Sequence, residues 1–92
     1  MTSVPRDRGS QDYVPPPDLL PAFPLARRAR PKTRLPWGGL RARWKDSDRI
    51  YEWDYRHGAV EVYDRRGRHL GQFDPATGLR QKPADPLREV EP

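Results

Sequence analysis

The sequence predicts a mainly β fold, a small twisted antiparallel sheet of four to five short strands behind an extended, proline-rich N-terminal segment with room for one short helix. Apolar and charged residues alternate in short runs that are separated by turns containing glycine and proline, which is the pattern of strands and hairpins. Of the 92 residues only 34% are hydrophobic. A chain of this size and composition suits one small domain with a thin core.

Residues 1–25 are interpreted as a proline-rich lead-in that ends in a hydrophobic clip. Pro15, Pro16 and Pro17 keep the chain extended, because proline fixes φ and disfavours helix before it. Asp18 can cap a single helical turn, which the next two prolines limit. Four apolar side chains are expected to pack on the sheet as the clip: Leu19, Leu20, Phe23 and Leu25. A partner-binding proline motif is the competing interpretation.

Residues 26–92 are interpreted as the functional domain, with a basic arm at 26–45, a central hairpin at 50–64 and a C-terminal tail at 83–92. The arm is expected to be irregular as far as Pro36, because prolines interrupt it. The following Leu40 to Trp44 alternates apolar and basic residues, which indicates a strand.

The stretch from Ile50 to Asp64 is the centre of the predicted sheet, because aromatic and β-branched residues alternate with charged ones on either side of His57-Gly58. A two-residue turn at this pair would place Asp54 opposite Glu61. One face would be apolar and the other charged. The charged side chains are Glu52, Asp54, Arg56 and Glu61.

Two further strands are expected after the hairpin. Asp64 to Gly67 has the residues of a turn closed by a left-handed glycine. A bulge at Gly71 in the next strand would bring both Leu70 and Phe73 to the core. Residues 79–82 can supply a last short strand, and the tail is expected to be ordered by contacts.

The charge distribution favours a polyanion as partner. The chain has 18 Lys and Arg against 13 Asp and Glu, and nine basic residues lie with only two acidic ones between Arg27 and Arg49. Fifteen of the basic residues are arginine, which forms forked contacts to phosphate and stacks on bases. A nucleic acid is therefore the first expectation, and a solvated basic surface is the alternative.

Other classes of protein are disfavoured by what the chain lacks. There is no cysteine and there are only two histidines, so neither a structural metal nor a cofactor is predicted. No apolar run is long enough to span a membrane, and the first residues lack the apolar core of a signal peptide. These features predict a soluble chain.

Asp54, His57 and Glu61 together suit acid–base chemistry. A histidine can donate or accept a proton near neutral pH, one carboxylate can orient it, and a second carboxylate can make the opposite transfer. The alternative is an ordinary solvated strand face with a turn histidine. His69 has no acidic neighbour at a useful spacing and is interpreted as structural. For Tyr51, roles in the core and in function are equally expected.

Beyond these patterns, the sequence resembles the cytotoxic ribonuclease domain of the ribosome-inactivating colicins, in order from about Arg43 to Arg88. The matching segments are Arg49 to Asp54, His57-Gly58, Glu61, Tyr63, His69 to Gly71, Phe73 to Pro75, Thr77-Gly78, and Asp85-Pro86 with Arg88. The chain departs from the family at Ala59, where colicin domains often have an acidic residue.

The resemblance implies a metal-independent endoribonuclease at the end of a larger bacteriocin, one that cuts 16S ribosomal RNA of the 30S subunit at the decoding site. It implies that four residues are catalytic: Asp54, His57, Glu61 and Arg88. It also implies that Tyr51 belongs to the active site. We expect RNA contacts from Tyr51, Arg41, Arg43, Lys45, Arg49 and Arg56.

In the mechanism we expect, Glu61 takes the proton of a 2′-hydroxyl, His57 protonates the leaving 5′-oxygen and Asp54 holds His57. Arg88 stabilises the negative charge that develops on the phosphate. The product would end in a 2′,3′-cyclic phosphate. A ribonuclease acting on transfer RNA and a non-catalytic RNA- or ribosome-binding module are the rival functions.

The resemblance further implies a monomeric toxin domain that the producing cell secretes within a larger toxin. It would act in the cytoplasm of the target bacterium. The producer would need protection, so a small acidic immunity protein that pairs with the basic surface is expected as partner.

Overall fold

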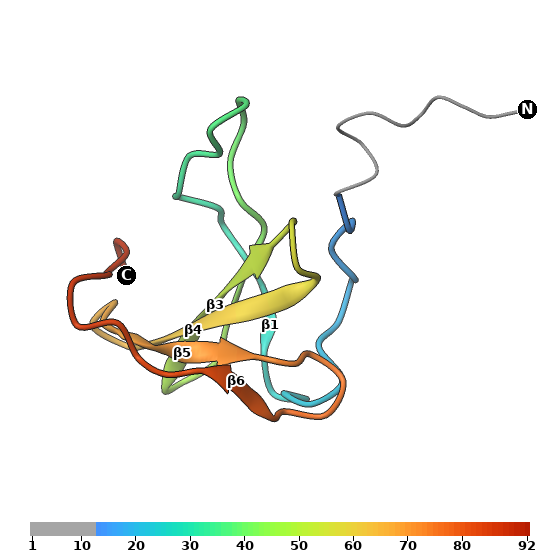
Figure 1. Ribbon diagram of the computed structural model, residues 1–92, viewed down its shortest axis with the longest axis vertical. Helices are drawn as coiled ribbons and strands as arrows, with labels where there is room; N and C mark the ends of the chain where they lie inside the picture. The colour runs from blue at the N-terminus through green and yellow to red at the C-terminus, as the bar shows by residue number, and fades with distance from the viewer. Residues whose placement is uncertain (1–12) are drawn as a thin grey trace, which may run out of the picture.

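The computed structural model describes residues 13–92 and shows one antiparallel sheet with its strands in chain order (Figure 1). The strands are β1 (Arg27–Ala29), β2 (Arg43–Lys45), β3 (Arg49–Asp54), β4 (Ala59–Asp64), β5 (His69–Phe73) and β6 (Arg80–Lys82). The predicted antiparallel β fold is confirmed. No helix occurs in residues 13–92, so the turn expected at Asp18 does not extend into one. None of these residues therefore forms a helix that could cross a membrane.

The sheet has six strands because part of the basic arm, expected to be irregular, forms β1. Arg28 pairs with Trp44 of β2 in this edge strand. The Arg28 guanidinium also lies 4.9 Å from the centroid of the Trp44 ring, a cation–π contact that favours the pairing. Three residues are too few for their periodicity to reveal a strand.

The β3–β4 hairpin has the two predicted faces but not the predicted register. Glu61 lies opposite Glu52, whereas Asp54 lies opposite Ala59. The loop contains four residues, 55–58, because the Asp54 Oδ1 atom accepts the backbone N–H groups of two of them, as short aspartate side chains do in turns. The slip is by two residues, so each side chain keeps its face.

The core lies on one face of the sheet and is closed by residues 13–25, the part of the lead-in that the structure describes. Its buried side chains are Leu20, Ala26, Ala42, Trp44, Tyr51, Trp53, Val60 and Val62. The lead-in is held by two indole N–H groups: Trp44 donates to the Asp18 carbonyl at 2.9 Å and Trp53 to the Val14 carbonyl at 2.7 Å. Buried indole nitrogens need such partners, so the lead-in both covers and satisfies the core.

The predicted clip is only half correct. Leu20 is buried, and Phe23 packs with its ring centroid 5.0 Å from that of Tyr51. Leu19 and Leu25 are exposed: Leu19 lies in a bend of the chain, and Leu25 lies in the turn that the Ala26 N–H closes on the Phe23 carbonyl at 3.0 Å. Two residues rather than four therefore anchor this segment.

The bulge predicted at Gly71 is present. The β4–β5 register shifts between Val62 and Tyr63, and Gly71 has a φ of +141°. Leu70 and Phe73 both pack against the core, as expected.

The C-terminal tail is bound to the turn between β4 and β5. Gly67 has a φ of +90°, its carbonyl accepts the Val90 N–H at 2.8 Å, and the Arg88 carbonyl accepts the His69 N–H at 3.1 Å. A Cβ atom at position 67 would lie 2.0 Å from the Val90 carbonyl oxygen. Only glycine permits this approach, which places Arg88 over the polar face of the sheet.

We expect Gly67→Ala to detach the tail. The matched control is Gly38→Ala, because Gly38 also has positive φ but has nothing within 4 Å of an added Cβ. The control should lose about 1–2 kcal/mol of unfolding free energy from backbone strain alone. Gly67→Ala should lose more and should also lose hydrogen-exchange protection at the Val90 amide. Equal losses in both variants would contradict the role of the close approach.

Candidate active site

A ladder of buried polar side chains crosses four strands on the face opposite the core. Arg43 of β2 lies beside Glu52 of β3, Glu52 beside Glu61 of β4, and Glu61 beside Gln72 of β5. All four residues are buried, with Glu61 and Gln72 each 4% exposed. Two carboxylates directly opposite one another repel, so each needs its own donors.

The donors of Glu52 come from the basic arm. Arg43 donates from Nη2 at 2.8 Å and from Nε at 3.1 Å to Glu52 Oε2, and the Thr33 hydroxyl donates to the same oxygen at 2.6 Å. Arg43 is 1% exposed, and its Nη1 has no hydrogen-bond partner. The Arg43 side chain, predicted to bind RNA, is therefore enclosed in an ion pair and is not on the surface.

The donors of Glu61 come from β5. Oε1 lies 2.8 Å from His69 Nε2, and Oε2 accepts a hydrogen bond from the Gln72 side-chain amide at 2.8 Å. The same amide nitrogen of Gln72 donates to Asp54 Oδ2 at 3.0 Å. One buried amide thus joins the two carboxylates for which the sequence predicted acid–base roles.

His69 was interpreted as structural because the sequence showed no acidic neighbour for it. That premise is wrong, because Glu61 lies beside its ring. The Asp85 backbone N–H donates to His69 Nδ1 at 2.9 Å. Nδ1 is therefore the acceptor, and the ring hydrogen lies on Nε2, facing Glu61. The C-terminal tail in this way sets the tautomer of a residue that contacts Glu61.

Sequence signals for His69 and Gln72 were present. The turn from Asp64 to Gly67 pairs β4 with β5, and a diagonal neighbour in such a pair shares the face of its partner. The bulge at Gly71 that directs Leu70 and Phe73 to the core also directs His69 and Gln72 to the opposite face. His69 was nevertheless interpreted as structural and Gln72 was given no role, because the bulge shifts the β4–β5 register that decides which residues lie beside Glu61.

Asp54 and His57 form a second pair on the hairpin loop. His57 Nδ1 lies 2.7 Å from Asp54 Oδ2, and the His57 side chain is 51% exposed. Burial would raise the pKa of Asp54, but hydrogen bonds from the His57 side chain and from the backbone outweigh it and hold that pKa below its ordinary value. With Nδ1 turned to Asp54, Nε2 is the nitrogen that His57 can offer to another molecule.

The lowered pKa of Asp54 predicts an acid-dependent loss of stability. The stabilisation is present above the unfolded pKa, near 3.8, and disappears as the pH falls through the lower folded value. Between about pH 5 and pH 2, the free energy of unfolding should fall more steeply in the unaltered chain than in Asp54→Asn. Urea unfolding at several pH values measures this difference, and parallel curves would contradict it.

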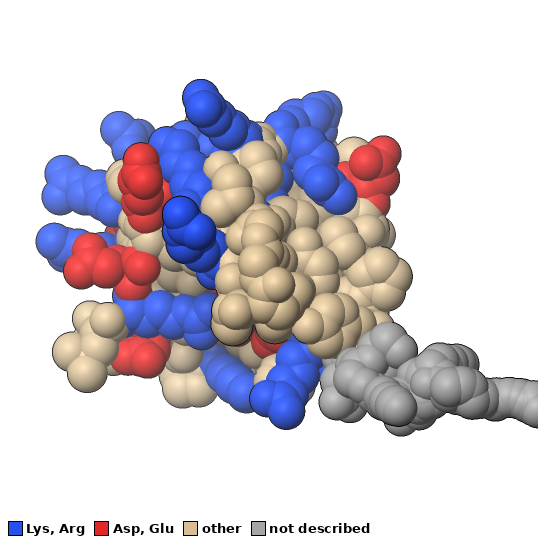
Figure 2. All heavy atoms as spheres, turned by 90° about the horizontal axis from the view of Figure 1, so that it is seen from above, with Lys and Arg blue, Asp and Glu red and all other residues tan. Residues whose placement is uncertain are grey.

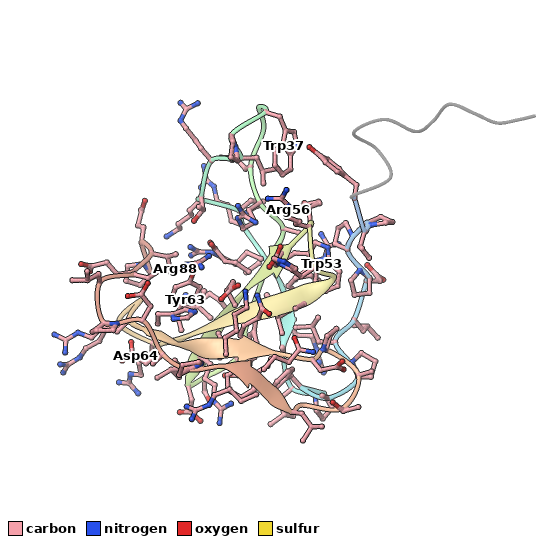
Figure 3. The ribbon with its side chains drawn as sticks, in the orientation of Figure 1. Trp37, Trp53, Arg56, Tyr63, Asp64 and Arg88 are labelled. Carbon is pink, nitrogen blue, oxygen red and sulfur yellow. The ribbon has the colours of Figure 1, made fainter. Side chains whose placement is uncertain are left out.

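Arg88 completes the polar face from the tail. Its Nε donates to the Tyr63 hydroxyl at 3.0 Å, and its Nη1 lies 3.6 Å from Glu61 Oε1. Burial raises the pKa of Tyr63 to about 12. Burial would lower the pKa of Arg88, but Tyr63 and Glu61 outweigh it and raise that pKa. Figure 3 shows Arg88 and Tyr63 together on the side of the sheet that the tail covers.

A cleft of about 590 Å³ lies between the start of β5 and the tail. Its lining includes His69, Asp85 and Arg88. In residues 13–92 no group of three or more His, Cys, Asp or Glu side chains is arranged to hold a metal ion. The groups gathered on this face are proton donors and acceptors together with two guanidinium groups, the buried one of Arg43 and the half-exposed one of Arg88.

Tyr51 is not brought to this face. Its side chain lies in the core, and its hydroxyl donates to Asp46 Oδ2 at 2.5 Å. Burial, with further contributions from Asp46, raises the pKa of Tyr51 well above its ordinary value. The alternation along β3 separates Tyr51 from Glu52 and Asp54.

The other predicted RNA contacts are at least partly open to solvent. Arg41 is half-buried and donates from Nη1 to the Trp53 carbonyl at 2.7 Å. Lys45, Arg49 and Arg56 are exposed. Seen from above, the molecule carries Lys and Arg side chains along much of its outline (Figure 2). An anionic partner would meet positive charge before it met the buried carboxylates.

Comparison with known proteins agrees with the resemblance. Residues 14–91 match the Cytotoxic protein family. The chain is 41% identical over 86 residues to cloacin, 40% over 86 residues to colicin-E6 and 40% over 92 residues to colicin E3, all from Escherichia coli, with 87% of the chain covered in each case. It spans only 15–16% of the length of these relatives.

A family match over most of the chain, together with about 40% identity to three colicin-type proteins, goes well beyond a shared sheet topology. The resemblance suggested by the hairpin and tail motifs is thereby confirmed. This chain belongs to the Cytotoxic family, as a bacterial toxin domain of the colicin type.

Proposed function

We propose that the chain is a metal-independent endoribonuclease that stops translation by cutting 16S ribosomal RNA at the decoding site of the 30S subunit. The proposal rests on one observation: the side-chain amide of Gln72 joins the carboxylates of Asp54 and Glu61. Asp54 holds His57 at 2.7 Å, Gln72 joins Asp54 to Glu61, and Arg88 lies 3.6 Å from Glu61. These are the groups required to cleave RNA through its own 2′-hydroxyl.

The reaction needs one proton removed and one delivered. Glu61 accepts the proton of a 2′-hydroxyl, whose oxygen then forms a bond to the adjacent phosphorus. The bond from phosphorus to the 5′-oxygen breaks, and His57 Nε2 donates a proton to that leaving oxygen. The products are a 2′,3′-cyclic phosphate and a free 5′-hydroxyl.

Asp54 and Arg88 assist the two proton-transfer groups, His57 and Glu61. Asp54 accepts from His57 Nδ1, which orients Nε2 outward and stabilises the ring when it carries a positive charge. Arg88 has a half-exposed side chain and can reach a phosphate above Glu61. Its charge opposes the negative charge that develops on the phosphate oxygens.

Intact ribosomes provide the test. The chain is first dialysed against EDTA and then against metal-free buffer. It is incubated with 70S ribosomes in the Mg²⁺ buffer that keeps them intact, and all RNA ends are mapped. A single new end in 16S RNA, with a cyclic phosphate, supports the proposal. New ends in transfer RNA would instead support a different nuclease target. RNA binding without new ends would support a non-catalytic module, and cleavage that needs an added metal ion other than Mg²⁺ would contradict metal independence.

We propose the same partners as the family resemblance implies. The net charge of +5 suits pairing with a small acidic immunity protein, since opposite charges steer association. The producer would secrete the monomeric domain within a larger toxin, and the domain would act in the cytoplasm of the target bacterium. A protein encoded beside the toxin gene that restores growth of cells expressing this chain would identify the immunity partner.

Gln72 is expected to contribute to the rate through the two carboxylates it joins. Gln72→Leu removes the donors to Asp54 and Glu61, and hydrogen bonds to charged groups contribute about 1.5–3 kcal/mol each. We expect kcat to fall about ten- to a hundredfold with little change in KM, because Gln72 acts through Asp54 and Glu61. The matched control, Gln81→Leu on the exposed strand β6, should leave kcat unchanged. An unaltered kcat in Gln72→Leu would contradict this role.

A further inference from the structure

Trp37 differs from the other two tryptophans in that its side chain is exposed to solvent. Trp44 and Trp53 are 0% and 2% exposed, whereas Trp37 is 52% exposed. It lies in the loop between β1 and β2, which an isolated bridge between Arg34 and Leu40 closes. This loop rises above the sheet in Figure 1. A large aromatic ring placed in solvent within the basic arm contributes little to the core.

The Trp37 ring is nevertheless held in a defined place. The Tyr13 ring packs on it at a centroid distance of 4.8 Å, and the Tyr55 ring meets it edge to face at 6.0 Å. Tyr55 is itself fixed, because its hydroxyl accepts the Ala42 N–H at 3.3 Å and its carbonyl accepts the Val14 N–H at 2.7 Å. Two neighbouring rings thus hold the Trp37 ring in place, and about half of its surface remains exposed.

This aromatic cluster adjoins the candidate active site. Tyr55 directly follows Asp54 and begins the loop that carries His57. Figure 3 shows Trp37 and Arg56 at the same end of the molecule, and in this view Arg56 lies between Trp37 and Trp53 of β3. A chain whose phosphate reached His57 would lie beside the adjacent Arg56, at the end of the molecule where Trp37 is found.

The surface around the ring carries the charge that such a chain requires. Arg34 and Arg56 are exposed, and Arg41 is held beside the hairpin by its bond to the Trp53 carbonyl. In the view from above, which faces this loop, basic side chains border an uncharged surface (Figure 2). An aromatic face bordered by arginines is how proteins bind unpaired bases, by stacking on the base and neutralising the adjacent phosphates.

We propose that Trp37 is the stacking site for one unpaired RNA base next to the scissile phosphate, with Arg56 contacting the intervening backbone. The inference rests on the proposed function in taking RNA as the ligand. Stacking tolerates any base, because each has a π-face. Trp37 therefore adds affinity for single-stranded RNA and restricts cleavage to sites where a neighbouring base is free to leave its helix.

Tryptophan fluorescence offers a direct test. Trp44 and Trp53 are buried, so a bound base can stack on the Trp37 ring and quench it without contacting the other two. The full chain with His57→Ala, which keeps bound RNA intact, is titrated with a short single-stranded RNA and with an abasic oligonucleotide of the same length. We expect the RNA to quench tryptophan emission and the abasic backbone to bind with little quenching. Equal quenching by both would overturn the proposal, since backbone contacts alone would then explain it.

Substitutions separate stacking from packing. In the same background, Trp37→Ala should weaken binding of the RNA about ten- to a hundredfold, as loss of one base–aromatic contact does, and should leave abasic binding unchanged. Trp37→Phe should restore most of the affinity. The control Leu40→Ala, in the same exposed loop, should change neither. If Trp37→Ala binds both oligonucleotides as the parent does, or weakens both equally, the ring does not stack on a base.

Cleavage of ribosomes by the unaltered chain is measured separately. If no new RNA ends form, the proposed function fails, while quenching that depends on bases still supports the stacking site. If ribosomes are cut at equal kcat/KM by the unaltered chain and by Trp37→Ala, the stacking site fails alone. If Trp37→Ala lost affinity for an acidic partner protein but not for RNA, the surface would be a protein interface and the proposal would be wrong.

Discussion

His57→Ala and Glu61→Gln should each lower the rate of ribosome cleavage by about a hundred- to ten-thousandfold, the usual contribution of one proton-transfer group. His57 lies on a half-exposed loop, so its truncation leaves the core unchanged. Glu61→Gln keeps the size of a buried side chain but removes the charge that accepts the 2′-hydroxyl proton. Single-turnover cleavage of 70S ribosomes, with saturating toxin, measures the chemical step apart from binding.

The two substitutions should not be additive, because both groups act in one step. The double variant should be about as slow as the slower single variant. Glu91→Gln provides the matched control: it removes a carboxylate that is 73% exposed and whose one ion pair within residues 13–92 is with Lys32 at 3.7 Å. Cleavage at the normal rate by His57→Ala would refute the assignment of the acid, and rate losses that multiply in the double variant would show that the two groups contribute independently and not as one unit.

Breaking the Arg43–Glu52 ion pair should have the largest effect on stability. Arg43→Met or Glu52→Leu alone leaves an uncompensated charge in a site where both side chains are at most 1% exposed. Each single variant should lose about 3–5 kcal/mol of unfolding free energy, whereas replacing both partners by apolar residues should recover most of that loss. Urea unfolding of the four members of this double-mutant cycle measures the coupling.

The exposed pair between Lys32 and Glu91 is the control for that cycle. Its side chains are 34% and 73% exposed, and such pairs contribute less than about 1 kcal/mol. A loss from Arg43→Met that is no larger than the loss from Lys32→Met would mean that the buried pair does not stabilise the fold. The salt dependence of RNA binding also separates the two kinds of arginine: Lys45→Met should reduce its slope, and the Arg43→Met/Glu52→Leu double variant should not.

The faces of the central hairpin could be predicted because alternation is a local property of the chain. Residues two apart in a strand share a face whatever the partner strand is. Tyr51 and Trp53 are therefore in the core and Glu52 and Asp54 opposite it, although the predicted register was off by two. The same reasoning predicted the bulge, since only glycine at position 71 allows Leu70 and Phe73 to face one way.

The register itself could not be predicted because it depends on how the loop is closed. The Asp54 carboxylate accepts two loop N–H groups, which favours four loop residues over the two expected. The longer loop changes the strand pairing, so that Glu61 lies opposite Glu52 and not opposite Asp54. It also explains why Arg43 is buried: a carboxylate opposite another carboxylate needs a cation, and β2 supplies it.

By itself the sequence determined the β class, the faces of the hairpin, the turn at Gly67, the bulge at Gly71 and the family. Only the tertiary structure decided which side chains meet: His69 and Gln72 on Glu61, Arg88 on Tyr63, and Tyr51 away from them all. The physical reason is the distance along the chain over which each effect acts. Periodicity and turn chemistry act over a few neighbouring residues, whereas these contacts join strands and a tail whose relative positions depend on loop hydrogen bonds, on one bulge and on a glycine close to a distant carbonyl.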